Sequence, residues 1–172
     1  MDRVKIRYIE KKDDSAIAKI IRENLRKYHL DIPGTAYYDP ELDHLSKYYL
    51  ENVHERVYFI AETEAGEVVG GMGMELFAGF DRCGEIQKLY VSEKMKRQGL
   101  GQRLLETIEN YAGSRGIERL YLETHSNLRE AVALYEKNGY QKINRPKEVV
   151  HSTMDLFYIK EFVSESLSKV RS

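Results

Sequence analysis

The spacing of apolar residues divides the chain into strand-like and helix-like segments. Apolar and polar positions alternate, or β-branched and aromatic residues gather, at residues 4–10, 56–63, 67–77, 84–92, 118–124, 140–144 and 151–160, which predicts strands. Apolar residues spaced three and four apart predict helices at residues 13–30, 40–50, 100–112 and 127–140. The order βααβββαβαββ predicts an α/β fold (an α+β mixed sheet), with a single central twisted sheet and helices on both faces.

Capping residues mark several of the predicted boundaries. Residues 13–15, Asp-Asp-Ser, can cap the first helix, and Asp39 can cap a second helix that begins at Pro40. Asn138–Gly139 is typical of a helix C-terminus. The glycines within residues 67–77 weaken that strand, and we favour a bulge or close packing there over the close approach of a ligand.

Composition and charge narrow the class of protein. The 172 residues, 42% hydrophobic and 32% charged, fit one domain over residues 1–160 followed by a polar tail at residues 161–172. A net charge of -1 argues against a nucleic-acid binder. Cys83 is the single cysteine, so no internal disulfide can form, and no Cys/His spacing predicts a metal site. Because neither a signal core nor a membrane-spanning run is evident, we expect a cytoplasmic protein without membrane contact.

A basic, glycine-containing loop, "KRQGLGQ" at residues 96–102, joins a predicted strand to a predicted helix. A helix N-terminus presents unpaired N–H groups and partial positive charge, and glycines let a phosphate approach them. Lys94, Lys96, Arg97 and Arg103 add charge, so the loop is typical of a pyrophosphate cradle. The chain has no Walker A motif, and Leu104 stands where a dinucleotide fingerprint needs its third glycine. A tight turn with solvated Lys and Arg remains the alternative.

Two motifs resemble the Gcn5-related N-acetyltransferase (GNAT) superfamily. Lys96 to Gly101, "KRQGLG", is similar to the family pattern [Q/R]xxGx[G/A], with Lys in place of Gln or Arg at its first position. Ala131 to Tyr140, "AVALYEKNGY", is similar to the family's AxxLYxxxGF run. Leu128 occupies the place where the family commonly has asparagine, and Asn127 lies one residue away. The resemblance extends from residue 4 to residue 159 and implies a GNAT-like fold.

The resemblance implies acetyl-CoA as the cofactor. Backbone N–H groups from Gln98 to Gln102 would bind the pyrophosphate, and the strand end from Leu89 to Val91 would pair with the pantetheine arm. Tyr90 can equally be half-buried packing within the sheet. The implied cofactor-binding residues are Leu89, Tyr90, Val91, Lys96, Arg97, Gln98, Gly99, Leu100, Gly101, Gln102, Asn127 and Tyr135.

Acetyl transfer needs a base, because a lysine-like amine has a pKa of about 10.4 and must lose a proton before it attacks a thioester. By resemblance, Glu85 is the candidate, since it precedes the strand-end residue Val91 by the family's spacing. Strand alternation predicts that Glu85, Gln87, Leu89 and Val91 share one face. Glu123, at the end of the next strand, is the competing carboxylate. A solvated carboxylate at the strand edge is the alternative for Glu85.

The leaving thiolate needs an acid, and Tyr135 matches the family tyrosine that often supplies the proton. A core aromatic residue on the last helix is the alternative for Tyr135. A backbone N–H near Leu89 is the implied donor to the oxyanion. An acetylated Cys83 is disfavoured, because no His partner lies near it in the sequence.

The acceptor side is least defined by sequence. Aromatic and acidic residues gather at residues 27–49, and Tyr37 and Tyr38, with Glu123, are the candidate substrate-binding residues. Ordinary loop packing explains this segment equally well. We expect a small-molecule or amino-acid-like primary amine as substrate, attacking within a ternary complex. A protein or peptide acceptor and a non-catalytic acyl-CoA-binding module are the alternatives, and family habit implies a homodimer.

Overall fold

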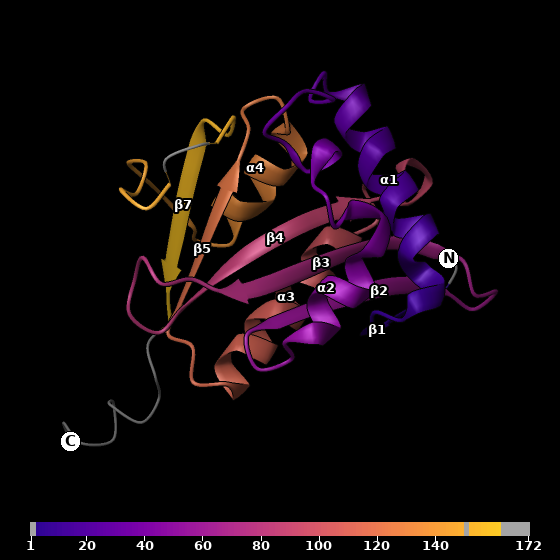
Figure 1. Cartoon of the computed structure of the whole chain (residues 1–172), viewed down its shortest axis with the longest axis horizontal. Coiled ribbons are helices and arrows are strands. Elements are labelled where there is room, and N and C mark those ends of the chain that lie inside the picture. Colours follow the sequence, from indigo (N-terminus) through magenta and orange to yellow (C-terminus); the bar gives the residue numbers. More distant parts are fainter. Residues whose placement is uncertain (1–2, 150–151, 163–172) are drawn as a thin grey trace.

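The structure, a computed structural model, describes residues 3–149 and 152–162. Its strands are β1 (Val4–Tyr8), β2 (Arg56–Thr63), β3 (Val68–Leu76), β4 (Cys83–Val91), β5 (Arg119–Thr124), β6 (Gln141–Ile143) and β7 (Leu156–Glu161). Its α-helices are α1 (Asp14–Lys27), α2 (Leu45–Glu51), α3 (Leu100–Ser114) and α4 (Arg129–Lys137). The predicted order βααβββαβαββ and the mixed α/β class are confirmed (Figure 1). β7 begins later than predicted; residue 151 of the predicted last strand and residues 163–172 of the predicted tail lie outside the described residues.

The sheet changes direction at one pair of strands. Its order is β1-β2-β3-β4-β5-β7-β6, and β4 and β5 are parallel while the other neighbours are antiparallel. Parallel pairing joins Cys83–Ile86 only to Arg119–Leu122, although β4 continues to Val91. Beyond that point the two strands separate (Figure 1). The sheet is therefore open in its middle, at the end of β4.

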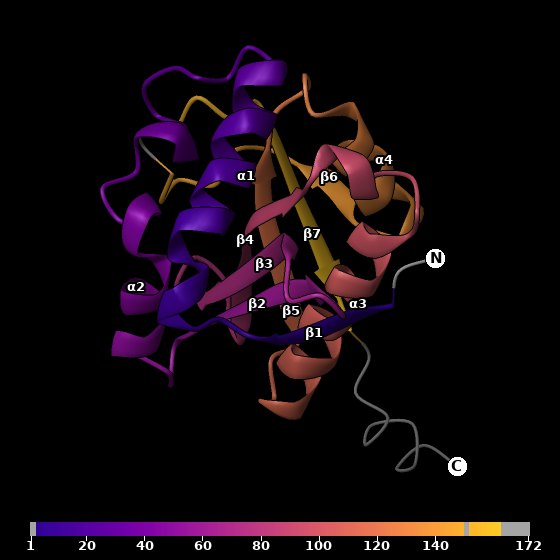
Figure 2. The ribbon, with the colours of Figure 1, turned by 90° about the vertical axis from the view of Figure 1, so that its right-hand side faces the viewer.

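Two layers of helices cover the sheet. In Figure 2, α1 and α2 lie on one side of the strands and α3 and α4 on the other. The buried apolar residues of α3 belong to one apolar cluster. The buried apolar residues of α1 form a second cluster with Tyr58 and Ile60 of β2. The predicted arrangement of helices on both faces is confirmed. None of the helices in the described ranges is long and apolar enough to cross a membrane.

A bulge in β4 overturns one prediction from strand alternation. Gly71 pairs with Tyr90 but Gly73 pairs with Gln87, so β4 holds one extra residue, and Lys88 has a φ of 50°. A bulge of one residue reverses which side chains face each layer. Leu89 packs with the α3 cluster, whereas Gln87 accepts a hydrogen bond from the Tyr49 hydroxyl on α2 (2.7 Å). The prediction that residues 85, 87, 89 and 91 share one face is therefore wrong.

The glycines of β3 serve close packing beside this bulge. A Cβ atom on Gly73 would lie 2.6 Å from the Tyr58 ring and 2.9 Å from the Tyr49 hydroxyl. A Cβ atom on Gly71 would also meet the Tyr58 ring. The favoured interpretation of a bulge with close packing is confirmed.

The predicted caps have other partners. Asp14 accepts hydrogen bonds from the Ser46 N–H (2.8 Å) and hydroxyl (2.7 Å), so it caps α2 instead of α1. Asp39 forms an ion pair with Lys88 (2.8 Å), and α2 begins at Leu45 after a 3₁₀ turn at Leu42–His44. The predicted start at Pro40 is wrong, because the carboxylate that would cap that helix is held by the β4 bulge.

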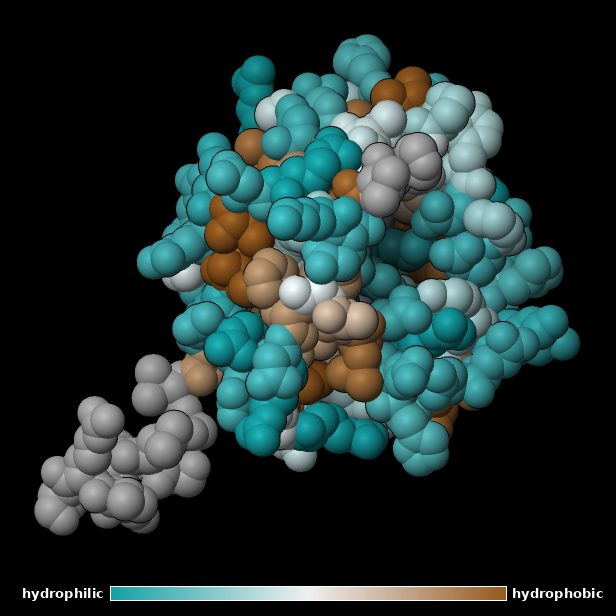
Figure 3. Space-filling model, turned by 60° about the vertical axis from the view of Figure 1, so that its left-hand side comes forward, coloured by the Kyte–Doolittle hydropathy of each residue, from teal (hydrophilic) through white to brown (hydrophobic). Residues whose placement is uncertain are grey.

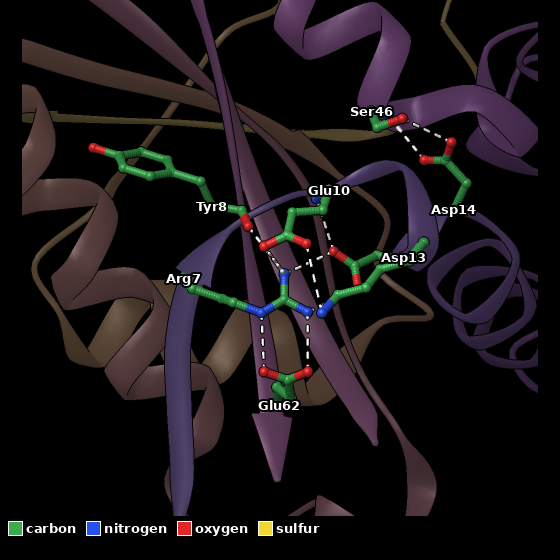
Figure 4. A network of polar contacts seen from close by, with 8 residues as sticks. Arg7, Tyr8, Glu10, Asp13, Asp14, Ser46 and Glu62 are labelled. Carbon is green, nitrogen blue, oxygen red and sulfur yellow. Dashed lines mark hydrogen bonds and ion pairs between the residues drawn. The ribbon is translucent and has the colours of Figure 1, made fainter. Parts of the chain in front are cut away.

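Arg7 joins the first strand to the start of α1 and to β2 (Figure 4). Its guanidinium donates two hydrogen bonds of 2.8 Å to Asp13 and bonds of 2.9 and 3.1 Å to Glu62. The Arg7 side chain is 14% exposed and that of Asp13 is 2% exposed. Asp13 also accepts the Glu10 N–H (2.8 Å). The arginine therefore neutralises one buried carboxylate, Asp13, and one partly buried carboxylate, Glu62.

Replacing Arg7 with methionine is expected to lower the free energy of unfolding by about 2–4 kcal/mol, because two partly buried carboxylates lose their cation. Urea unfolding at pH 7 measures the loss. Arg22→Met is the control, since it removes a pair with Asp43 whose carboxylate is 59% exposed, and such pairs contribute about 1 kcal/mol or less. Equal losses in the two variants would contradict the role assigned to Arg7.

Candidate functional site

The separation of β4 and β5 opens a cleft of about 350 Å³. It is bounded by the end of β4, the loop that follows, the first turn of α3, the end of α1 and one side of α4. Nine of the predicted cofactor residues line it: Leu89, Tyr90, Val91, Lys96, Arg97, Gly99, Leu100, Gly101 and Gln102. Gln98, Asn127 and Tyr135 do not. The structure therefore brings most of the sequence-predicted residues to one place.

The backbone at the start of α3 suits an anion. Arg97 and Gly99 have φ values of 62° and 77°, which turn the chain sharply into the helix. The first helical N–H to bond back is that of Arg103, which donates to the Gly99 carbonyl (3.1 Å). The N–H groups of the three residues before it precede the helical ladder and have no acceptor there. A Cβ atom on Gly99 would meet nothing within 4 Å, so the approach is open.

Only part of the basic cluster reaches this cleft. The Lys96 ammonium lies 3.2 Å from the Tyr28 hydroxyl, and Arg97 lines the cleft beside it. Lys94 pairs with Glu67, and the Arg103 guanidinium donates to the Val4 carbonyl (2.8 Å). The sequence predicted that all four cations contribute to the cradle, but Lys94 and Arg103 bond to residues outside the cleft.

The free edge of β4 faces the cleft. The Ser92 N–H donates to the Val69 carbonyl of β3 (2.8 Å), so alternation turns the N–H and C=O of Val91 to the opposite edge. The Asn24 amide donates to the Val91 carbonyl (3.1 Å) and to the Ile20 carbonyl (2.9 Å). Asn24 is 8% exposed and lines the cleft. Sequence reasoning missed it, although a polar residue within the apolar stripe of α1 was the available signal.

Asn127 lies outside the cleft. Its amide donates to the Tyr28 carbonyl at the end of α1 (3.0 Å), and its side chain is exposed. The neighbouring Leu128 lines the cleft instead. The Gln98 side chain likewise bonds within its own loop, to the Lys94 carbonyl (3.1 Å). A contact of either side chain with a ligand in the cleft is not supported.

Tyr135 lies in the apolar layer of α4. It is 5% exposed and its ring meets that of Tyr140 edge to face, with centroids 5.7 Å apart. Burial, and then the nearby Tyr90 phenol, raise the pKa of Tyr135 well above its ordinary value. Ala131 and Leu134 on the same helix line the cleft. The phenol therefore keeps its proton until a strong base forms close to it.

Glu85 lies on the face of β4 opposite to Leu89, one residue before the pairing of β4 with β5 ends at Ile86. Its register partners are Glu75 on β3 and Tyr121 on β5. Burial, and then the carboxylates of Glu123 and Glu75, raise the pKa of Glu85 to about 7, although Lys88 and a hydrogen bond with Gln87 oppose the rise. A carboxyl group that titrates near neutral pH can accept a proton from an amine and release it again. The burial and the charges around Glu85 are therefore compatible with the base role that the sequence predicts.

Glu75, directly opposite Glu85, is held ionised. Its carboxylate accepts hydrogen bonds from Tyr48 (2.6 Å), Arg56 (3.0 Å) and Gln87 (3.2 Å). Although burial opposes ionisation, these bonds hold the pKa of Glu75 below its ordinary value. Glu75 is therefore ionised in the pH range in which Glu85 exchanges its proton.

Tyr37 and Tyr38 lie on the loop between α1 and α2. The Arg26 guanidinium donates to the Tyr37 hydroxyl (2.8 Å), and Tyr38 is 60% exposed. Neither lines the cleft between β4 and β5. The same loop is fixed to the β4 bulge, because Lys88 pairs with Asp39 (2.8 Å) and Glu41 (3.5 Å).

Two other chemistries find no support in the described ranges. Cys83 is 3% exposed, and burial raises the pKa of its thiol to about 12, so it stays protonated and unreactive near neutral pH. Within residues 3–149 and 152–162, no three His, Cys, Asp or Glu side chains gather as metal ligands would.

Comparison with known proteins agrees with this geometry. The model of the Acetyltransferase (GNAT) family matches residues 21–140. The uncharacterized N-acetyltransferase YjgM of Escherichia coli (strain K12) is 37% identical over 142 residues, 81% of this chain and 83% of that protein. The matched region contains the loop at residues 96–102 and the run from Ala131 to Tyr140.

Solved structures share the fold. A GNAT-family acetyltransferase from Staphylococcus aureus Mu50 superposes with a TM-score of 0.80 at 17% identity, covering 92% of this chain and 99% of that one. The PaiA N-acetyltransferase from Thermoplasma acidophilum, solved in complex with coenzyme A, has a TM-score of 0.73 at 18% identity, with 93% and 99% covered. With the match of the family model to residues 21–140, these findings show that the chain belongs to the GNAT family of N-acetyltransferases.

Proposed function

We propose that this protein transfers the acetyl group of acetyl-CoA to a primary amine of a small molecule, amino-acid-like amines included, by direct attack within a ternary complex. The single observation that carries the proposal is the split between β4 and β5. The start of α3, whose N–H groups suit an anion, lies on one side of this opening, and a carboxyl group with a pKa of about 7 lies on the other.

The cleft residues would hold the coenzyme along its length. The N–H groups at the start of α3 suit the pyrophosphate, with Lys96 and Arg97 supplying charge. The free edge of β4 from Leu89 to Val91 suits the amide groups of the pantetheine arm, as an added strand would. Asn24, which already bonds the Val91 carbonyl, would fix that edge in place.

Two side chains would move the protons. The coenzyme supplies a thioester, whose carbonyl carbon the amine nitrogen attacks while the C–S bond breaks. Glu85 takes the proton of the attacking amine, directly or through a water molecule, and its pKa of about 7 suits that task. Tyr135 gives its proton to the departing sulfur, because its raised pKa keeps the phenol protonated beforehand.

Replacing Tyr135 with phenylalanine is expected to lower kcat about tenfold to a hundredfold, since a positioned acid is lost. The Kd for acetyl-CoA, measured by calorimetry, is expected to change by less than about twofold, because the ring and its packing remain. Tyr140→Phe is the control: its ring touches that of Tyr135, but its hydroxyl bonds Glu109 (2.9 Å). An unchanged kcat in Tyr135→Phe would remove Tyr135 from the acid role.

Binding followed by turnover tests the function. We expect calorimetry to give micromolar Kd values for acetyl-CoA and CoA and no binding of ATP. Thiol release in the presence of a panel of small amines, amino acids and lysine-bearing peptides then identifies the acceptor class. Acetyl-CoA binding without turnover across the panel would favour a non-catalytic acyl-CoA-binding module. Turnover of peptides alone would favour a protein acceptor, and absence of CoA binding would overturn the proposal.

A further inference from the structure

Two side-chain carboxamides form a reciprocal pair between the start of α3 and the end of α4. The Asn138 amide donates to the Gln102 side-chain oxygen (2.7 Å), and the Gln102 amide donates to the Asn138 side-chain oxygen (2.8 Å). The second N–H of each group bonds locally, that of Asn138 to the Leu134 carbonyl (2.8 Å) and that of Gln102 to the Glu106 carboxylate (2.9 Å). All the N–H donors of both groups are therefore used, which fixes the orientation of the pair.

The pair joins two walls of the cleft that the sheet leaves apart. Parallel pairing of β4 with β5 ends at Ile86, and α4 follows β5 along the chain. Gln102 lines the cleft from the first turn of α3, whereas Ala131 and Leu134 line it from α4. The hydrogen bonds between Gln102 and Asn138 therefore help to set how far α4 lies from the start of α3.

Gln102 belongs to the group of residues that suits an anion. Its backbone N–H comes before that of Arg103, the first to bond back within α3. The neighbouring Gly101 shows how closely α4 approaches, because a Cβ atom added there would lie 3.3 Å from the Leu134 side chain. One residue thus offers its backbone to a pyrophosphate and its side chain to α4.

Asn138 lies one helical turn after Tyr135. Its backbone N–H donates to the Tyr135 carbonyl (3.1 Å), and so does the N–H of Tyr140 (3.1 Å). Among the described residues no group hydrogen-bonds to the Tyr135 hydroxyl, so the place of that hydroxyl depends on the helix that carries it. A tie at the Asn138 side chain therefore acts on the turn that holds Tyr135.

Figure 3 brings forward the side of the molecule on which β5 and β7 lie in Figure 1. Its surface is mainly hydrophilic, apart from an apolar group near the centre. Such a surface offers a partner protein little apolar area to bind. What holds α4 against α3 in this structure is therefore the set of contacts within the chain, the amide pair among them.

We propose that Asn138 is a positioning residue for acetyl transfer: by bonding Gln102, it holds the Tyr135 hydroxyl where the coenzyme sulfur lies when the pyrophosphate is bound at the start of α3. The inference rests on the proposed function and adds a residue to it. The pyrophosphate and the sulfur belong to one molecule, so the two protein groups that serve them must keep a fixed separation. A proton donor must lie within hydrogen-bond reach of its acceptor, and a displacement of about 1 Å can lower a rate about a hundredfold.

Two variants remove the pair from opposite sides. Asn138→Ala and Gln102→Ala are each expected to lower kcat about threefold to thirtyfold, because the turn that carries Tyr135 loses its tie to α3. The double variant should be no slower than the slower single variant, since the two side chains act as one unit. The Kd for acetyl-CoA should stay within about threefold, because Gln102→Ala keeps the backbone N–H and Asn138 does not line the cleft.

The rate is thiol release at saturating acetyl-CoA, with the amine of the panel that the wild type acetylates fastest. Crossing the variants with Tyr135→Phe separates positioning from a merely structural role. If Asn138 acts through Tyr135, Asn138→Ala should change kcat by less than about twofold in the Tyr135→Phe protein, where no phenol remains to be positioned. An equal factor in the two backgrounds would overturn the inference. An unchanged kcat in Asn138→Ala, or in Tyr135→Phe, would also overturn it.

Glu106→Ala is the matched control. It removes a hydrogen bond from the same Gln102 amide, on the exposed side of α3, and leaves the pair with Asn138 intact. Its kcat should lie within about twofold of the wild-type value. Equal losses in Glu106→Ala and Asn138→Ala would overturn the inference. The Tm of each variant is measured as well, and rates are compared well below the lowest Tm.

Failure of this inference and failure of the function have different signatures. A wild-type protein that releases no thiol with any amine of the panel would overturn acetyl transfer, and the inference with it. Normal turnover in the wild type, with Asn138→Ala and Gln102→Ala equally fast, would overturn the inference alone.

Discussion

Replacing Glu85 with glutamine is expected to lower kcat/KM about a hundredfold or more at pH 7, the range that a positioned general base contributes. The Kd for acetyl-CoA should stay within about twofold, because Glu85 does not line the cleft proposed to bind the coenzyme. Wild-type kcat/KM should rise with pH through about 7, as the Glu85 carboxyl group loses its proton and becomes able to accept one. Steady-state rates from pH 5.5 to about 9 measure both effects.

Glu123→Gln separates the two candidate bases. If Glu85 is the base, the rise of rate through about pH 7 disappears in Glu85→Gln and persists in Glu123→Gln. Loss of that limb in Glu123→Gln alone would transfer the role to Glu123. Unchanged profiles in both variants would leave proton removal to solvent, and the raised pKa of Glu85 would then reflect only its burial.

The raised pKa of Glu85 also makes the free energy of unfolding depend on pH. The pKa of Glu85 is raised in the folded state from 4.5 to about 7, so folding binds a proton between these values and stability falls as pH rises through that window. Glu85→Gln removes this loss. The variant is therefore expected to exceed the wild type in free energy of unfolding at pH 8 by roughly 1–3 kcal/mol, and to lose that advantage near pH 4. Urea unfolding at the two pH values checks the sign.

Placing aspartate at Gly99 or Gly101 is expected to weaken acetyl-CoA binding at least about a hundredfold. Either carboxylate would project at the start of α3, where it blocks the N–H groups and repels a pyrophosphate. At Gly101 an added Cβ atom would lie 3.3 Å from the Leu134 side chain, and at Gly99 the φ of 77° adds strain. Calorimetry with acetyl-CoA measures the loss, and Tm values report whether each variant is folded.

Gly113→Asp is the matched control for these variants. It makes the same substitution on α3, but near the C-terminal end of the helix, where a Cβ atom meets nothing within 4 Å. Its Kd for acetyl-CoA should equal that of the wild type. Normal binding in Gly99→Asp and Gly101→Asp as well would show that the pyrophosphate is bound elsewhere.

Local patterns predicted the elements well, because their causes are local. The β2 boundaries at Arg56 and Thr63 and the start of α3 at Leu100 agree with the periodicity of the sequence. The predicted C-cap of α4 is confirmed, since Gly139 has a φ of 84° beyond Asn138. Each of these features depends on residues within a few positions of one another.

Predictions that needed a distant partner were less successful. Asp39 was expected to begin a helix, but Lys88 holds it. Asn127 stays a predicted cofactor contact, but its amide bonds the Tyr28 carbonyl and does not line the cleft. Asn24 was not singled out, although it bonds the free edge of β4. In each case the side chain bonds an element far along the chain, and no local pattern carries that contact.

The sequence by itself determined the order of the strands and helices, the glycine turn into α3 and the two motifs, because propensity, period and turn chemistry act over a few residues. Only the tertiary structure decided which groups meet. The extra residue at Lys88 turns Glu85 and Leu89 to opposite faces of β4. The pairing of β4 with β5 ends after Ile86, and the cleft opens where the two strands separate. The pKa of Glu85 follows from this, because burial and the neighbouring carboxylates come from strands that pair across the sheet.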